Sequence, residues 1–267
     1  MSSGVQASLR YGVNTSGRRS RVLRRGIRLE YDDSRFEERS VTIHNGRPLA
    51  DSFLLDRDGF VFVRHETLVK DFFDRDELEN VYYPEVKQLV RRITGGSRVV
   101  VFDHTLRAGD ELMRQEKKIR EPVIAVHNDY TENSAPQRVR DLLPDEADEL
   151  LKHRFQIVQV WRPVNVPAIR SPLALCNAAS ISTEDLILTE LVYEHRTGEI
   201  YHLAYNPEHE WYYFPEMQAD EALVFKVYDS LDDGRARYTA HGAFDDPSTL
   251  PDAPPRQSIE VRTLVFF

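Results

Sequence analysis

The chain has 267 residues, of which 41% are hydrophobic and 30% are charged, so it is long enough to bury a full core without disulfide support. Its 35 basic and 44 acidic side chains give a net charge of −9, which argues against a nucleic-acid partner and favours a small-molecule partner. The single cysteine, Cys176, excludes an internal disulfide and a cysteine-built zinc site, and indicates a cytoplasmic protein. The sequence has no apolar run of about 20 residues, so no membrane partner is expected.

The first 27 residues are polar and rich in arginine, with five arginines between positions 18 and 25. They contain no apolar stretch of the kind that a secretory signal requires. We predict that residues 1–27 form a flexible, arginine-rich arm, and a targeting or phosphate-contacting segment is the alternative. Residues 28–267 are expected to form a single domain, because no composition break divides them.

The middle of the chain alternates between strand-like and helical patterns. Apolar residues at a three-and-four spacing predict a helix that ends at Gly95-Gly96, and the continuous apolar run after it predicts a strand buried on both sides. The expected elements are strands at 41–44 and 59–63, a helical stretch over 67–94, a strand at 97–104, a charged mobile loop over 108–121, a strand at 122–130 and helices over 135–153.

The rest of the chain is dominated by strands. Seven short strand-like segments at regular spacing predict a sandwich or barrel, so the fold class is mainly β with flanking helices. These segments are 154–161, 186–193, 200–205, 211–214, 222–228, 237–241 and 258–266.

Three residues could hold one metal ion. His127 and Asp129 stand at alternate positions where the 122–130 segment ends, so their side chains can point to the same side. His241 ends a later strand-like segment, just before Gly242. Two histidines and one carboxylate on one face of an ion are typical of non-haem Fe(II) oxygenases, although these ligands alone would also suit a catalytic zinc.

A second pair of residues favours iron. Arg256 and Ser258 open the last strand and lie on the same strand face. A guanidinium can bind a carboxylate with two parallel hydrogen bonds, and the serine hydroxyl can add a third. This pair therefore suits the distal carboxylate of 2-oxoglutarate.

The order of H-x-D, distal histidine and R-x-S resembles the Fe(II)/2-oxoglutarate-dependent dioxygenase superfamily. More narrowly, the chain is similar to the hydroxylase/desaturase family of secondary-metabolite clusters, which includes proteins linked to cephalosporin methoxylation and to fungal gibberellin desaturation. The blocks that carry this similarity are Val101-Phe102-Asp103-His104 with Arg107, His127-Asn128-Asp129-Tyr130-Thr131, Trp161-Arg162-Pro163, Phe225-Lys226-Val227-Tyr228-Asp229-Ser230, His241-Gly242-Ala243-Phe244 and Arg256-Gln257-Ser258-Ile259-Glu260-Val261-Arg262.

The resemblance implies a double-stranded β-helix core, a jelly-roll of the cupin kind, that uses Fe(II), 2-oxoglutarate and O2. It implies that the chain hydroxylates, desaturates or cyclises a small secondary metabolite and releases succinate and CO2. The residues it assigns are His127, Asp129 and His241 as iron ligands and Arg256 with Ser258 as the clamp for 2-oxoglutarate.

Several further residues are reserve or alternative candidates for the site. Arg262, on the same strand face as Arg256, is the reserve candidate for the clamp, and Lys226 and Tyr228 are reserve donors that alternate with the apolar residues of their strand. An aromatic wall for the substrate is expected from Tyr130, Trp211 and Tyr213, with core packing as the alternative role.

The remaining histidines have structural interpretations. We expect His104 to make a structural hydrogen bond, and His202 and His209 to lie at the surface or to support the ligands. Asn177 stands where the family resemblance leads us to expect an acidic residue. Two alternative functions stay open: a cupin-like metalloenzyme that does not use 2-oxoglutarate, and a metal-free jelly-roll that binds a ligand.

Overall fold

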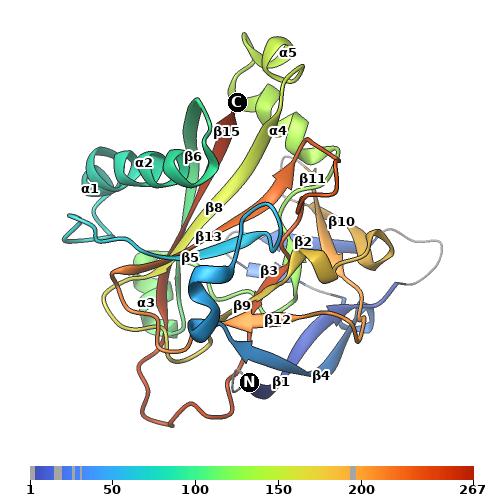
Figure 1. The fold of residues 1–267 in the computed structure, drawn as a ribbon. Helices are drawn as coiled ribbons and strands as arrows, with labels where there is room; N and C mark the ends of the chain where they lie inside the picture. The colour runs from blue at the N-terminus through green and yellow to red at the C-terminus, as the bar shows by residue number, and fades with distance from the viewer. Residues whose placement is uncertain (1–3, 15–19, 26–27, 31, 193–196) are drawn as a thin grey trace.

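Two β-sheets face each other in the computed structural model, which describes residues 4–14, 20–25, 28–30, 32–192 and 197–267 (Figure 1). The five-stranded sheet is fully antiparallel. Its order is β5 (Phe60–Arg64), β13 (Glu221–Asp229), β8 (Phe155–Pro163), β15 (Gln257–Phe266) and β6 (Arg98–Ala108). Because β8 and β13 are buried along their whole length, they form the centre of the fold.

The ten-stranded sheet is more irregular, and it contains the short strands on which two of the predicted ligands lie. Its order is β1 (Gly4–Gly12), β4 (Phe36–Asn45), β12 (Trp211–Tyr213), β9 (Leu173–Cys176), β14 (His241–Ala243), β7 (His127–Asn128), β11 (Thr197–Leu203), β10 (Leu186–Val192), β2 (Ser20–Arg25) and β3 (Arg28–Glu30).

The helices lie at the periphery, as Figure 1 shows. They are α1 (Arg75–Glu77), α2 (Tyr83–Thr94), which follows a π-helical turn at Leu78–Tyr82, α3 (Glu111–Lys117), α4 (Ser134–Leu142) and α5 (Ala147–Leu150). Short 3-10 turns occupy Asp33–Arg35, Arg47–Ser52, Ala178–Ser180 and Thr183–Asp185. Among the described residues, no helix is long and apolar enough to cross a membrane.

The five-stranded sheet has a different core on each face. On its outer face, Val86, Leu89 and Val90 of α2 pack against valines of β8, β13 and β15. Gly95, in the left-handed conformation with φ of 73°, ends α2 as predicted. On the inner face, large residues such as Phe225 fill the space between the sheets.

The last strand brings polar side chains into this inner space. In β15, Ile259 and Val261 belong to the outer core under α2. Since successive side chains of a strand point to opposite faces, Ser258, Glu260 and Arg262 point toward the other sheet. The fold therefore places one polar stripe of β15 opposite β7 and β14.

The flexible arm predicted for residues 1–27 is wrong for two described segments within it. Gly4–Gly12 is strand β1, which pairs with β4 over nine residues and buries Ala7, Leu9 and Tyr11. Ser20–Arg25 is strand β2 of the same sheet. The average polarity of the segment concealed the alternation that makes β1 a strand, while residues 1–3, 15–19 and 26–27 lie outside the described part.

Three other predictions need correction. The segment 108–121 contains α3, capped by Asp110, rather than only a loop. The strand predicted over 122–130 is reduced to His127–Asn128. Only the end of the segment 237–241 reaches the sheet: β14 begins at His241, Ala240 O accepts from Cys176 N of β9 at 2.8 Å, and the backbone N–H of Thr239 donates to Asn128 Oδ1 at 3.2 Å.

Candidate metal centre

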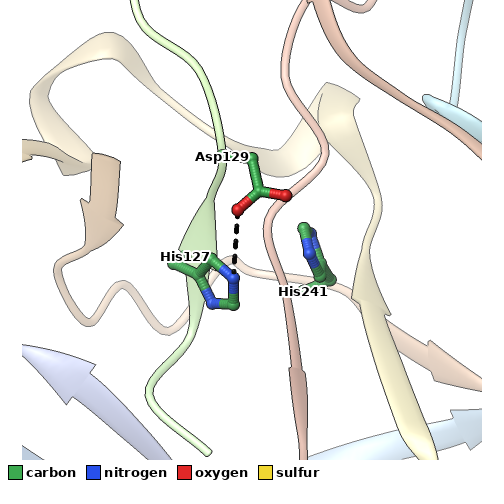
Figure 2. Close-up of side chains that lie close together, drawn as sticks. All are labelled: His127, Asp129 and His241. Atoms are coloured by element: carbon green, nitrogen blue, oxygen red, sulfur yellow. Dashed lines mark ion pairs between the residues drawn. The ribbon is translucent and has the colours of Figure 1, made fainter. Parts of the chain in front are cut away.

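The three predicted ligands come together between the sheets. His127 of β7 and His241 of β14 are register partners on neighbouring strands, and Asp129 lies just beyond β7. Each of the three offers one ligand atom, and these atoms lie within 4.8 Å of one another. Figure 2 shows the three side chains converging, with Asp129 Oδ1 3.5 Å from His127 Nε2.

Backbone carbonyls hold both imidazole rings. His127 Nδ1 donates to Ala125 O at 2.8 Å, and His241 Nδ1 donates to Thr239 O at 3.0 Å. Because a carbonyl only accepts, Nδ1 of each ring carries a proton, and Nε2 is the nitrogen that can bind a metal. His241 Nε2 is buried with no hydrogen-bond partner among the described residues. A bound cation would satisfy this buried acceptor.

Burial also keeps His241 neutral. Burial, with a smaller effect of the nearby His127, lowers the pKa of His241 to about 4. The ring is thus an uncharged donor at neutral pH, which is the form that binds a metal.

The carboxylate of Asp129 completes the donor set. Burial alone would raise its pKa, but the charge of Arg262 and the contact with His127 outweigh burial and hold the pKa of Asp129 well below its usual range. Two neutral imidazoles and one charged carboxylate are the ligands that non-haem Fe(II) sites use. The residues therefore fit iron.

Arg256 is a buried cation without a protein anion. Its side chain belongs to a residue that is only 2% exposed, and its Nη1 donates to Ser171 O at 2.6 Å. Within the described ranges, no carboxylate lies at ion-pair distance and Nε has no partner. Burial, with a smaller effect of Arg107, lowers the pKa of Arg256 to about 9. Ser258 Oγ is also buried and has no partner among the residues that the structure describes, so the pair matches a carboxylate ligand.

The reserve candidates are already engaged. Arg262 contacts Asp129, Asp103 and Glu260, so its guanidinium is surrounded by protein carboxylates. The fully buried Lys226 Nζ lies 2.6 Å from Asp56 Oδ1 and 2.8 Å from Asp229 Oδ2.

Tyr228 differs from its predicted orientation. It packs against Phe155, with ring centroids 5.2 Å apart, in the apolar core between the sheets. A shift in register between Lys226 and Tyr228 changes the alternation of β13 at this point. The prediction that Tyr228 faces away from the apolar side is therefore wrong.

A cavity of about 560 Å³ opens beside His127 and Asp129. This volume is in the range of small-molecule sites, about 300–1,000 Å³. The cavity is lined by Tyr130 next to the ligands, Arg138 of α4, Leu191 of β10, and Ile200 and His202 of β11, among others.

Only one of the three predicted aromatic substrate residues lines this cavity. Tyr130 does, whereas Trp211 and Tyr213 belong to the core around the ten-stranded sheet. Trp211 Nε1 donates to Tyr11 OH at 2.6 Å, and the ring of Tyr213 packs on Phe244 at 5.3 Å. Their strand β12 is enclosed between β4 and β9, which accounts for the core packing.

The histidines outside the ligand set have structural contacts. His104 Nδ1 is 2.5 Å from Tyr83 OH, which confirms the predicted structural hydrogen bond. His202 and His209 are buried rather than at the surface. His202 Nδ1 is 2.9 Å from Thr189 Oγ1, and His209 Nε2 is 3.1 Å from Asp185 Oδ2.

Two positions complete the account of the predicted site. Asn177 accepts a hydrogen bond from Ala179 N at 3.1 Å and so caps a turn. Gln159 was missed by sequence reasoning, although its Nε2 donates to Asp129 Oδ2 at 2.5 Å. A polar residue within a strand predicted to be buried is the signal that could have indicated it, although Gln156 and Arg162 of the same strand carry the same signal.

Comparison with known proteins defines the class of this site. A family model described as an oxidoreductase/YMDC permease-like domain matches residues 17–266. The Fe(II)/2-oxoglutarate-dependent dioxygenase nvfI of Aspergillus novofumigatus is 36% identical over 85% of this chain and 82% of its own. The hydroxylase/desaturase CTB9 of Cercospora beticola is 33% identical over 87% of this chain and 78% of its own.

Solved structures agree. A structure of the iron and alpha-ketoglutarate-dependent endoperoxidase NvfI superimposes with a TM-score of 0.87 and 28% identity, covering 100% of this chain and 99% of that one. The chain belongs to the Fe(II)/2-oxoglutarate-dependent dioxygenases, in the group that includes fungal hydroxylase/desaturases.

This membership confirms the predicted family, the jelly-roll fold, the enzyme class, and the use of Fe(II), 2-oxoglutarate and O2 on small secondary-metabolite substrates. It argues against both alternatives, the cupin-like metalloenzyme that does not use 2-oxoglutarate and the metal-free binding module.

Proposed function

We propose that His127, Asp129 and His241 hold the Fe(II) ion, and that Arg256 and Ser258 bind the distal carboxylate of 2-oxoglutarate. One observation carries this proposal: at both places where a ligand is needed, His241 Nε2 and the Arg256–Ser258 pair, buried donor and acceptor atoms have no partner within the described part of the chain. Buried polar groups normally have partners, so unsatisfied atoms in this arrangement support bound groups.

The chain's own residues would perform four tasks in this reaction. His127, His241 and the charged Asp129 would supply the metal ligands, while Arg256 would orient the cosubstrate by a forked hydrogen bond. Tyr130, Leu191 and Ile200 would exclude water and select the substrate carbon. Bound Fe(II) supplies the O2 chemistry, in which 2-oxoglutarate is converted to succinate and CO2.

The substrate cavity fits a small secondary metabolite that is hydroxylated, desaturated or cyclised. Its lining combines apolar residues such as Val22 and Leu191 with polar ones such as Asn133 and Gln137. Such a wall suits a substrate that carries both a carbon skeleton and hydrogen-bonding groups.

We also propose that the described chain works as one domain in the cytoplasm. Strands β1 and β2 complete the same sheet that carries His127 and His241, so the N-terminal segment and the site share one structure. Cys176 is a free, buried thiol whose pKa is raised by burial, which is compatible with a reducing compartment.

Removal of single ligands tests the iron assignment. His127→Ala, Asp129→Ala and His241→Ala should each abolish Fe(II)-dependent succinate release and weaken Mn(II) binding in anaerobic titration calorimetry, with little change in the fold. His153→Ala removes an exposed histidine and serves as the control. Wild-type Mn(II) affinity in any one of the three variants would show that the residue is not a ligand.

A further inference from the structure

The two oxygens of Asp129 have different surroundings. Oδ1 lies on the side of His127, 3.5 Å from Nε2. Oδ2 accepts a hydrogen bond from Gln159 Nε2 at 2.5 Å and lies 3.3 Å from both Nε and Nη2 of Arg262. Oδ2 is therefore occupied by protein donors, whereas Oδ1 faces the metal ligands.

Arg262 is fixed on the side away from Asp129. Its Nη1 donates to Asp103 Oδ2 at 3.2 Å and to Thr105 Oγ1 at 3.0 Å, and its Nη2 contacts Glu260. The residue is 8% exposed and lies on the central part of β15. A guanidinium held at several atoms presents its remaining donors in a constant direction.

Gln159 is fixed by the sheet itself. It is fully buried on β8, where it pairs with Phe225 of β13 on one side and with Arg262 of β15 on the other. Both groups that touch Oδ2 therefore come from adjacent positions of two central strands, which gives them little freedom to move.

We propose that Gln159 and Arg262 are positioning residues that hold Oδ2 of Asp129 so that the carboxylate binds iron through Oδ1 alone. This inference rests on the proposed function, in which Asp129 is a ligand. It assigns Arg262 to the metal side of the site instead of to the 2-oxoglutarate clamp.

This arrangement has a chemical consequence. A carboxylate that binds through one oxygen leaves more metal positions for the cosubstrate and O2 than one that binds through both. Outer partners of metal ligands also orient the ligand and tune metal affinity, and their loss typically lowers affinity about 10- to 100-fold.

The test is Co(II) titration of the purified apo protein, followed by calorimetry and by visible absorption. Gln159→Met nearly preserves the volume of the side chain and leaves the ion pairs of Arg262 in place, but it removes the Gln159 donor to Oδ2. We expect a loss of Co(II) affinity of about 10- to 100-fold. The Co(II) absorption spectrum should also change, because freeing Oδ2 allows a different coordination.

Gln156→Met is the matched control. Gln156 is a buried glutamine of the same strand, but its Nε2 donates to Asp229 at 2.9 Å, away from the metal site. This variant should keep wild-type Co(II) affinity and spectrum. Arg262→Gln should weaken Co(II) binding as well, and Arg262→Lys should recover part of it, because the positive charge returns without the fork.

The outcomes separate the inference from the proposed function. Wild-type affinity and spectrum in Gln159→Met, together with weak binding in Asp129→Ala, would overturn the positioning role while leaving Asp129 a ligand. Wild-type affinity in Asp129→Ala would instead remove the ligand assignment on which the inference rests. Equal losses in Gln159→Met and Gln156→Met would also overturn it, because the effect would then be a general one on the strand.

Discussion

Replacing Arg256 with methionine should weaken 2-oxoglutarate binding while leaving the apo protein as stable as before, or more stable. Arg256 is 2% exposed, and its guanidinium makes one described hydrogen bond, to Ser171 O. A buried cation without an anion destabilises the folded state, and methionine fills a similar volume without that charge. Arg256→Met should therefore leave the free energy of unfolding of the apo protein unchanged or raise it, while it lowers the affinity for 2-oxoglutarate.

The magnitude follows from the geometry of the clamp. A hydrogen bond to a charged group contributes about 1.5–3 kcal/mol, and a forked guanidinium can make two of them. Two such bonds amount to about 3–6 kcal/mol, and with about 1.4 kcal/mol for each tenfold change the loss of Arg256 should weaken 2-oxoglutarate binding about 100- to 10,000-fold. Ser258→Ala removes one neutral donor and should have a smaller effect, about 1 kcal/mol or roughly fivefold.

Titration of 2-oxoglutarate into the anaerobic, Mn(II)-loaded protein measures this change directly. Succinate release gives the corresponding KM, and urea unfolding gives the stability of the apo protein. Mn(II) affinity should be the same in Arg256→Met and wild type, since Arg256 contacts none of the three ligands among the described residues. Arg256→Lys should recover little, because an ammonium group cannot form the planar fork.

Two results would refute this reasoning. An unchanged affinity for 2-oxoglutarate in Arg256→Met, with a large loss in Arg262→Gln at saturating metal, would transfer the clamp to Arg262. A large fall in apo stability on Arg256→Met would show that the structural contacts of the guanidinium, such as the hydrogen bond to Ser171 O, outweigh the cost of its buried charge, and would refute a role limited to ligand binding.

The other predictions concern the support of the site and the effect of pH. Gly59 has φ of 86°, and a Cβ there would lie 2.2 Å from Thr239 Oγ1. Gly59→Ala should therefore lower the free energy of unfolding by more than about 1 kcal/mol and weaken Co(II) binding, since Thr239 O holds His241; wild-type values in urea unfolding and Co(II) titration would contradict this. Burial would raise the pKa of Asp229, but Arg154 and Lys226 outweigh burial and hold this pKa below its usual range. The stability that this carboxylate contributes is thus complete above about pH 4. It is lost as the pH falls through the lowered pKa that Asp229 has in the folded state. Asp229→Asn should reduce this loss in urea unfolding between pH 2.5 and 6, and parallel pH profiles for variant and wild type would contradict it.

The amino-acid pattern determined the local features of this protein. Alternation and apolar runs predicted most of the strands, including the long buried ones, because the period of the side chains is a property of the strand itself. The H-x-D spacing of His127 and Asp129 also predicted that these two side chains lie close together, since neighbouring positions of one segment stay close in any fold. The same strand argument paired Arg256 with Ser258, although Arg256 lies one residue before β15, which begins at Gln257.

Only the tertiary structure decided which of these features meet. His241 is a ligand candidate because β14 pairs with β7 in the register that places His241 opposite His127. The sequence alone does not distinguish His241 from a histidine on another strand. Arg262 and Gln159 reach Asp129 because β15 and β8 are neighbours, while Trp211 is enclosed in the core because β12 lies between β4 and β9. Such pairings depend on the burial energy of whole sheets, so no local periodicity in the chain encodes them.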